Sequence, residues 1–336
     1  MRIWFNHWFS TAYHLINLMK EREPERFVFI GSATNPNAIY KKACQEFYPE
    51  RHDVSGEEYL EFCLRFCREH EVDVFVPRHD LVSIVRARKR FEDAGVRLFA
   101  EKNGETVSIM DDKLRTYELL GTILPERVPE FRMARSLQEF EEAVSELSGR
   151  FERVCYKLAI DEGAQSFRVI DDRVERPGSI FNTPGNKVTF SGAMKVMGGY
   201  DFRIPVLVMP FLEEVEISVD CLKTGTGNIV IPRFKSGSRY SEVVFDRQIM
   251  DECSMLMDRL DMHMPFNIQY KKSGGRAYIL ELNTRMSGGL QQSCLASGIN
   301  IPMIALYGLL GEEIAWGYPP GLSSVRVANI ETPVCL

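Results

Sequence analysis

The chain has 336 residues, of which 45% are hydrophobic and 26% are charged. These values are ordinary for globular proteins, and the length exceeds one average domain. The formal net charge of -6 comes from interspersed acidic and basic residues, which argues against nucleic acid or an anionic membrane as partner. The chain begins MRIWF without a secretory pattern, and no apolar stretch approaches a membrane span. We therefore expect a cytoplasmic protein that acts on small molecules.

The first hundred residues alternate strand-like and helical patterns. β-rich runs occur at 2–5, 26–32, 72–77 and 96–100. Amphipathic helical patterns lie between them, at 10–21, 36–47, 55–70 and 79–95. This alternation predicts a parallel sheet with crossover helices, so this part belongs to the α/β class.

The turn after the first predicted strand reads NHWFS and lacks the glycine pattern GxGxxG. A nicotinamide-dependent oxidoreductase built on this sheet is therefore disfavoured. Asn6, His7, Arg78, His79 and Asp80 follow predicted strands at their carboxyl ends, where such sheets bind ligands. A single histidine there is more often an ordinary loop residue, so a function for this group stays open.

The pattern changes near residue 105. A helix started by acidic residues, MDDKLRTYELL, is followed by a proline-bearing link, a helix at 136–148 and strands at 153–160, 167–171 and 205–212. This part reads as a small α+β unit. Strands at 216–224 and 228–236, a helix at 241–260, two strands at 266–283 and two closing helices complete the expected order. We expect three domains, at 1–104, 105–205 and 206–336.

The most informative segment is FNIQYKKSGGRAYILELNTR, two strands joined by a Gly-Gly turn. Strand alternation places the side chains of Glu281 and Asn283 on one face, and Gln269 on the partner strand adds a third oxygen ligand. Such ligands suit magnesium. A glutamate in a half-buried strand is also an ordinary solvated residue, but Arg285 and the glycines of MSGGL directly after it favour a phosphate or carboxylate site.

Further candidates lie upstream. Lys157 ends the run RVCYK, and the loop DEGAQS after it contains Gly163, which permits backbone N–H groups to face phosphate oxygens. Considered alone, Lys157 is equally well interpreted as a lysine whose side chain reaches solvent. Lys113 and Glu216, each considered alone, are likewise interpreted as exposed charged residues.

Taken in order, the segments MDDKLRTYELL, VCYKLAIDEGAQSFRVI, VLVMPFLEEVEISVDCL and FNIQYKKSGGRAYILELNTRMSGGL resemble the successive motifs of the ATP-grasp superfamily. The resemblance covers residues 105–310, and the preceding sheet is similar to the pre-ATP-grasp domain. It implies a Rossmann-like N-terminal domain followed by an ATP-grasp fold of two subdomains. The carboxyphosphate-forming domains of carbamoyl phosphate synthetase and stand-alone carboxylate-amine ligases are the most similar members.

The resemblance also implies roles for particular residues. Those that bind the nucleotide phosphates, together with the lid loop, are Lys113, Lys157, Gly163 and Ser166. Those that bind adenine and ribose are Pro210, Phe211, Leu212 and Glu216. The magnesium positions are Gln269, Glu281 and Asn283, and the cations that face the transferred phosphate or the substrate are Arg285, Arg233 and Lys235.

By the same resemblance we expect an ATP-dependent ligase that uses Mg²⁺ or Mn²⁺. A small-molecule carboxylate would become an acyl phosphate, an amine would displace the phosphate, and ADP would be released. A homodimer is the commonest assembly. The lid loop carries Ala164 and Gln165 where glycine is common, and Pro210 lacks the N–H that a hinge residue supplies. The alternative is therefore an ATP-binding protein that has lost catalysis and serves a regulatory or binding role.

Overall fold

The computed structural model describes residues 1–51, 54–161, 165–175, 185–235, 237, 240–321, 324–330 and 332–335. The chain forms two compact units. The first unit consists of Met1–Asp111, Val215–Tyr270 and Leu282–Leu336, and the second consists of Asp112–Glu214 and Lys271–Glu281. The expected division into three domains stays a prediction.

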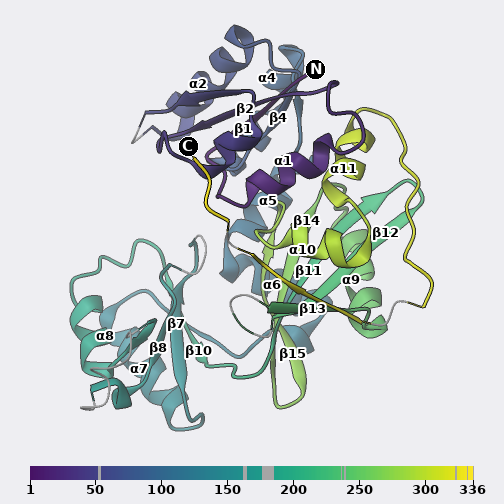
Figure 1. The fold of residues 1–336 in the computed structure, drawn as a ribbon. Coiled ribbons are helices and arrows are strands. Elements are labelled where there is room, and N and C mark those ends of the chain that lie inside the picture. Colours follow the sequence, from purple (N-terminus) through teal and green to yellow (C-terminus); the bar gives the residue numbers. More distant parts are fainter. Residues whose placement is uncertain are drawn as a thin grey trace. The chain divides into compact units, whose positions relative to one another are not determined.

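The first unit begins with a parallel sheet, as the sequence predicts, and this sheet has five strands where the sequence predicted four (Figure 1). Its strand order is β3-β2-β1-β4-β5. The strands are β1 (Arg2–Asn6), β2 (Val28–Ala33), β3 (Glu46–Pro49), β4 (Val74–Val76) and β5 (Arg97–Leu98). The accompanying helices are α1 (Ala12–Lys20), α2 (Gly56–Glu69), α3 (Leu81–Arg86), α4 (Arg88–Asp93) and α5 (Gly104–Asp111).

The helix expected over 36–47 is wrong. Only Ile39–Ala43 forms a short 3-10 helix, and Cys44 after it is extended. Glu46–Pro49 then forms strand β3, which pairs in parallel with β2. The run Glu-Phe-Tyr-Pro carries two aromatic residues that favour a strand, and pairing with the sheet edge outweighs the helical spacing of the apolar residues.

A second sheet has six strands in the order β15-β14-β11-β12-β13-β16. The strands are β11 (Glu216–Thr224), β12 (Gly227–Lys235), β13 (Tyr240–Val244), β14 (Phe266–Ser273), β15 (Arg276–Asn283) and β16 (Ser324–Ala328). The helices that follow its strands are α9 (Arg247–Arg259), α10 (Leu290–Ser297) and α11 (Ile301–Leu309). The helix expected over 241–260 is therefore wrong in its first part, because Tyr240–Val244 pairs with β12 and β16 instead.

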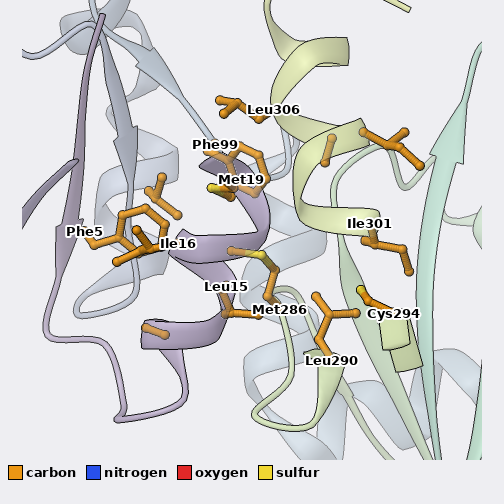
Figure 2. Packing of buried hydrophobic residues seen from close by; sticks show 14 of the residues in the cluster. Phe5, Leu15, Ile16, Met19, Phe99, Met286, Leu290, Cys294, Ile301 and Leu306 are labelled. Carbon is orange, nitrogen blue, oxygen red and sulfur yellow. The ribbon is translucent and has the colours of Figure 1, made fainter. Parts of the chain in front are cut away.

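One hydrophobic core unites distant parts of the first unit (Figure 2). Helix α1 contributes Ile16 and Met19, which are fully buried, and helix α11 contributes Ile301 and Leu306, also fully buried. Burial of each such side chain contributes roughly 1.5–3 kcal/mol. The N-terminal sheet and the C-terminal helices therefore share one core, although they are far apart in the sequence.

The second unit is built on a five-stranded sheet with the order β6-β10-β7-β8-β9. The strands are β6 (Arg132–Ala134), β7 (Val154–Leu158), β8 (Arg168–Ile170), β9 (Lys187–Val188) and β10 (Val206–Pro210). The helices are α6 (Lys113–Ile123), α7 (Leu137–Ser148) and α8 (Phe190–Met197), with 3-10 turns at Pro125–Arg127 and Asp172–Glu175. The acidic helix start is confirmed, because the Asp112 carboxylate accepts hydrogen bonds from the backbone N–H groups of Leu114 and Arg115.

Within the described residues, no helix combines the length and the apolar character needed to cross a membrane.

Candidate functional site

Two buried lysines of the second unit lie close to the end of strand β15. Lys113 begins helix α6, and its Nζ donates to the Asp161 carbonyl at 3.0 Å and lies 3.9 Å from the Glu281 carboxylate. Lys157 lies on β7, and its Nζ donates to the Leu280 carbonyl at 3.4 Å. Helix α6, strand β7 and strand β15 therefore bring together three residues that the sequence singled out.

Lys157 is held by neutral oxygens. Its second hydrogen bond goes to the Tyr117 hydroxyl at 3.2 Å, and no carboxylate oxygen of the described residues lies within 4 Å of Nζ. Burial lowers the pKa of Lys157, although the nearby Glu281 carboxylate opposes the shift. A buried ammonium group without a direct ion partner is costly, so an incoming anion stabilises this arrangement.

Tyr117 is a member of this group that the sequence reasoning missed. Its hydroxyl donates to the Leu280 carbonyl at 2.9 Å and accepts from Lys157. Burial raises the pKa of Tyr117, so the hydroxyl keeps its proton at physiological pH. The signal was present in the sequence, because Tyr117 lies four residues after Lys113 and so shares its face of the helix.

The expected lid loop is only partly described. Its end is fixed by the Ser166 hydroxyl, which donates to the Asp161 carboxylate at 2.6 Å and accepts from the Leu158 N–H at 2.9 Å. The Ser166 N–H donates to the same carboxylate at 2.8 Å. Gly163, which the sequence places on the phosphates, lies outside the described residues, so its role stays a prediction.

The expected adenine hinge follows strand β10. Pro210 pairs with Val154 in the sheet, and the Phe211 N–H donates to the Arg153 carbonyl at 2.9 Å. The Phe211 N–H is therefore already engaged. The Leu212 N–H has no hydrogen-bond acceptor among the described residues. If this segment binds a base, Leu212 supplies the donor that Pro210 lacks.

In the first unit, Glu216 and Lys235 face each other across strands β11 and β12. They are opposite in register, and their side chains form an ion pair. Both side chains are about a third exposed, at 28% for Glu216 and 34% for Lys235. The resemblance implies separate roles for these two residues, and the structure places them in one ion pair.

Arg233 is a buried cation on the same pair of strands. Its residue exposure is 4%, and one Nη donates to the Ser218 hydroxyl at 3.2 Å. The Nε atom has no hydrogen-bond partner among the described residues, and none of their carboxylates forms an ion pair with this guanidinium. A guanidinium has five N–H donors, so Arg233 is ready to bind a carboxylate or phosphate.

The Arg233 guanidinium lies against the N-terminus of helix α10. Gly289 is the residue that caps this helix, and a Cβ atom there would be 2.2 Å from an Arg233 Nη. A side chain at position 289 would therefore displace the guanidinium from this position. The partial positive charge of the helix N-terminus adds to the attraction for an anion.

A polar network beneath Arg233 holds its surroundings in place. The Asn267 amide donates to the Ser218 hydroxyl at 3.0 Å and to the Asp220 carboxylate at 2.9 Å, and the Ser293 hydroxyl donates to Asp220 at 2.6 Å. All four side chains are buried. Sequence reasoning missed them, because a polar residue in an apolar strand does not by itself reveal its partner.

The expected metal ligands lie on β14 and β15. Gln269 and Asn283 are partly exposed, and the Glu281 side chain is 23% exposed. Within the described parts of the chain, no group of three or more His, Cys, Asp or Glu residues is placed to hold a metal. The expected set contains one carboxylate and two amide oxygens, a donor set that fits magnesium because this ion keeps water and phosphate ligands.

Arg285 follows strand β15, and its guanidinium lies over the Phe9 ring at 5.4 Å from the centroid. The guanidinium of Arg78 lies over the same ring at 5.5 Å. Two guanidinium groups of the first unit therefore make cation–π contacts with the same Phe9 ring.

The sequence of the C-terminal part matches a known family. Residues 203–333 match the family described as ATP-grasp in the biosynthetic pathway with Ter operon. The carbamoyl phosphate synthase large chain of Sulfurisphaera tokodaii is 24% identical over 237 residues, which is 66% of this chain and 21% of that protein. This chain therefore spans about a fifth of the length of that relative.

Solved structures resemble the chain over almost its whole length. The N5-carboxyaminoimidazole ribonucleotide synthetase of Thermus thermophilus has a TM-score of 0.68 at 15% identity, covering 99% of this chain and 85% of that chain. The biotin carboxylase domain of the Hydrogenobacter thermophilus 2-oxoglutarate carboxylase, solved with MgADP, ADP and bicarbonate, has a TM-score of 0.66 at 16% identity. It covers 94% of this chain and 71% of that chain. At these identities the likeness is one of fold.

Proposed function

We propose that this chain, whose residues 203–333 match an ATP-grasp family, is an ATP- and magnesium-dependent ligase that activates a small-molecule carboxylate and joins it to an amine. The observation that carries the proposal is Lys157, a buried ammonium group whose hydrogen bonds go to two neutral oxygens. The γ- and β-phosphates of ATP are the anions that this arrangement accommodates best. Lys113, 3.9 Å from Glu281, supports the same assignment.

The remaining nucleotide contacts follow from the same assignment. Leu212 donates its N–H to adenine, beside the Pro210 carbonyl and Phe211, and Glu216 accepts from the ribose hydroxyls. Ser166 closes the lid loop that contains Gly163. Glu281, Asn283 and Gln269 hold Mg²⁺, or Mn²⁺ in its place, which neutralises charge on the phosphates.

The substrate carboxylate binds at Arg233, whose buried guanidinium lacks a carboxylate partner among the described residues. A carboxylate oxygen attacks the γ-phosphorus, an oxygen–phosphorus bond forms, and the bond to the β-phosphate oxygen breaks, so ADP leaves. The amine nitrogen then attacks the acyl carbon, and inorganic phosphate departs with the carbon–oxygen bonding pair. Arg285 and Lys235 supply further positive charge.

The experiment is ADP release from ATP and Mg²⁺ by the full chain, with a panel of small carboxylates in the presence and absence of amines. We expect ADP release that requires a carboxylate, together with stabilisation of the chain by ATP in a thermal melt. ATP-induced stabilisation without ADP release for any pair of substrates would instead support an ATP-binding protein with a regulatory role. Absence of both effects would contradict nucleotide binding itself.

A further inference from the structure

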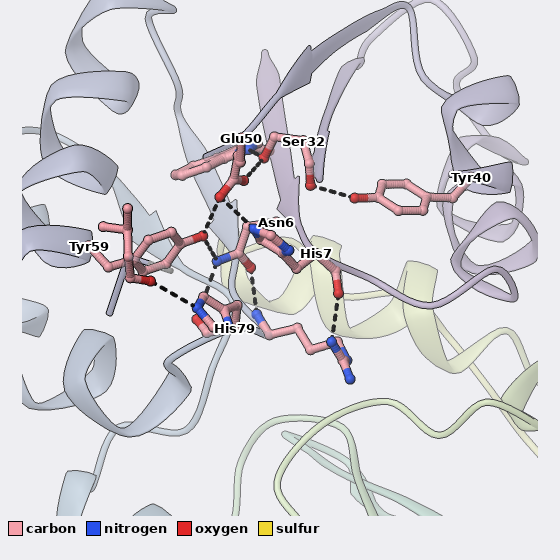
Figure 3. Close-up of polar contacts among 10 residues, drawn as sticks. Asn6, His7, Ser32, Tyr40, Glu50, Tyr59 and His79 are labelled. Carbon is pink, nitrogen blue, oxygen red and sulfur yellow. Dashed lines mark hydrogen bonds and ion pairs between the residues drawn. The ribbon is translucent and has the colours of Figure 1, made fainter. Parts of the chain in front are cut away.

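A buried carboxylate lies at the carboxyl edge of the N-terminal parallel sheet (Figure 3). Glu50 follows strand β3, and its side chain is 1% exposed. It accepts hydrogen bonds from the hydroxyls of Ser32 and Tyr59, the latter at 2.9 Å, and lies 2.6 Å from Nε2 of His7. A carboxylate only accepts hydrogen bonds, so the tautomer that fits these contacts has the His7 proton on Nε2.

The His7 imidazole is therefore fixed in orientation. Its backbone has a positive φ of 47°, and it follows strand β1 directly. Its N–H donates to the Ser32 carbonyl at 2.7 Å, and its own carbonyl accepts from Arg78 at 2.7 Å. The left-handed conformation is unfavourable for a residue with a side chain, and these two backbone hydrogen bonds hold it.

The second ring nitrogen of His7 is available to a ligand. With Nε2 donating to Glu50, Nδ1 carries a lone pair, and no described residue forms a hydrogen bond with it. The His79 ring lies beside the His7 ring, with centroids 4.9 Å apart. Two of the residues that the sequence placed at the carboxyl ends of the strands thus lie together.

His7 lines a groove of about 540 Å³ at the carboxyl ends of β1 and β2. Such a volume suits a small molecule, and the carboxyl ends of parallel strands are where open sheets bind ligands. The polar side chains of the groove are neutral, namely Ser10, Thr34, Asn35 and Asn37. Trp8 and Ile39 supply apolar surface.

We propose that this groove binds a primary amine, whose N–H group donates to Nδ1 of His7. No lysine or arginine is among the described residues that line the groove, whereas such a side chain is the usual partner of a carboxylate or phosphate ligand. An N–H donor is the ligand that the lone pair of Nδ1 and the neutral lining of the groove both favour.

Identification of this amine with the nucleophile of the ligase rests on the proposed function. The ammonium group transfers one proton to Nδ1 of His7, which becomes an imidazolium paired with Glu50. The freed nitrogen lone pair forms the bond to the acyl carbon, the carbon–oxygen bond to the phosphate breaks, and the leaving phosphate takes up the second proton that the nitrogen loses. The imidazolium then loses its proton to water. His7 is thus a catalytic base and Glu50 a positioning residue.

Binding is tested without nucleotide, so that this inference can fail independently of the ligase proposal. The full chain with ¹⁵N-labelled histidine is titrated with glycinamide, L-alaninamide and ethanolamine, and separately with inorganic phosphate and acetate. The His7 signals are assigned by their loss in His7→Gln. We expect an Nδ1 signal of the acceptor type that moves with the amines at millimolar concentration. Movement with phosphate or acetate alone, or with none of the five compounds, overturns the proposal.

Two variants test the role of the pair. In His7→Gln the side-chain amide reaches Glu50 but has no basic nitrogen, and Glu50→Gln presents an amide N–H that reverses the His7 tautomer. Both variants are expected to lose amine binding, and Glu50→Gln is expected to turn the His7 Nδ1 signal into a donor type. An unchanged tautomer in Glu50→Gln contradicts the assignment. His14→Gln, an exposed change on helix α1, is the matched control and is expected to bind amine normally.

The proposed catalytic role of His7 is tested separately, by the kinetics of amine-dependent ADP release. In His7→Gln we expect the kcat for amine-dependent ADP release to fall, with the KM for ATP unchanged. The rate is expected to recover as pH rises towards the pKa of the amine itself, because the free base then needs no proton acceptor. A loss that is equal at every pH marks a structural effect and overturns the catalytic role. A chain that binds amines but never releases ADP contradicts the ligase proposal alone.

Discussion

The ammonium group of Lys157 donates a hydrogen bond to the hydroxyl of Tyr117, which in turn donates to the Leu280 carbonyl. The buried charge is thus linked through a neutral phenol to strand β15, the strand that carries Glu281. Removal of either side chain changes the charge or the position of the group that we assign to the phosphates.

Lys157→Met removes the buried charge and keeps the length of the side chain. Burial lowers the pKa of Lys157 in the folded chain below its ordinary value of 10.5. The folded state therefore binds fewer protons than the unfolded state between the two values, and wild-type stability rises with pH across that window. Below the lowered pKa the cost of the charge is fully present, and above 10.5 it disappears.

We therefore expect Lys157→Met to lose ATP-induced stabilisation, yet to be more stable than wild type at neutral pH. This difference in the free energy of unfolding should shrink as pH rises towards 10.5, in urea titrations at several pH values. Lys195→Met, an exposed change on helix α8 of the same unit, should show neither effect. A stability difference that stays constant with pH would contradict the assigned shift.

Glu281→Gln tests the metal position. The substitution keeps the shape of the side chain and removes its charge, so Mg²⁺ loses the one carboxylate of its expected set. We expect ADP release to fall on the order of 100-fold, as when one group that stabilises transition-state charge is removed. Mg²⁺ should also cease to strengthen the ATP-induced thermal stabilisation. Glu118→Gln, exposed on helix α6, is the control, and normal turnover in Glu281→Gln would remove the metal assignment.

Gly289→Ala tests the anion site at Arg233. A Cβ atom at Gly289 would be 2.2 Å from the guanidinium, whereas a Cβ atom at Gly288 meets its nearest neighbour at an ordinary 3.5 Å. We expect Gly289→Ala, like Arg233→Met, to raise the KM for the carboxylate while ATP still stabilises the chain. Gly288→Ala should behave as wild type. Equal effects of the two alanine variants would show that the loop backbone, rather than the guanidinium, is responsible.

Leu306→Ala tests the core shared by α1 and α11. Leu306 is fully buried, and its truncation is expected to cost about 2–5 kcal/mol of unfolding free energy. Leu295, on the neighbouring helix α10, is 77% exposed. The change Leu295→Ala is expected to stay within about 0.5 kcal/mol, measured by the same denaturant titration. Similar costs for both variants would contradict the packing described for this core.

The sequence predicted the parallel N-terminal sheet, because apolar strands and amphipathic helices alternate there with clear periods. It failed at residues 36–47 and at 240–244, where pairing with a neighbouring strand decided the structure. Spacing within one element cannot reveal a partner strand that is distant in the chain. The same limit explains why strand β16 was missed.

At the candidate site, the sequence identified charged residues but not what holds them. Lys113, Lys157 and Glu281 were singled out by type and order. The neutral partners Tyr117 and Leu280 were not, because a backbone carbonyl or a phenol has no recognisable pattern until the fold places it. The pairing of Glu216 with Lys235 needed the register of two strands, and that register is visible only in three dimensions.

The core that joins Met19 to Leu306 has a consequence for biosynthesis. During translation, the apolar face of helix α1 stays uncovered until helix α11, almost three hundred residues later in the chain, has been synthesised. The N-terminal sheet therefore completes its packing only near the end of translation. Until then its exposed apolar surface can bind chaperones or cause aggregation. Fragments that stop before helix α11 should accumulate as insoluble material.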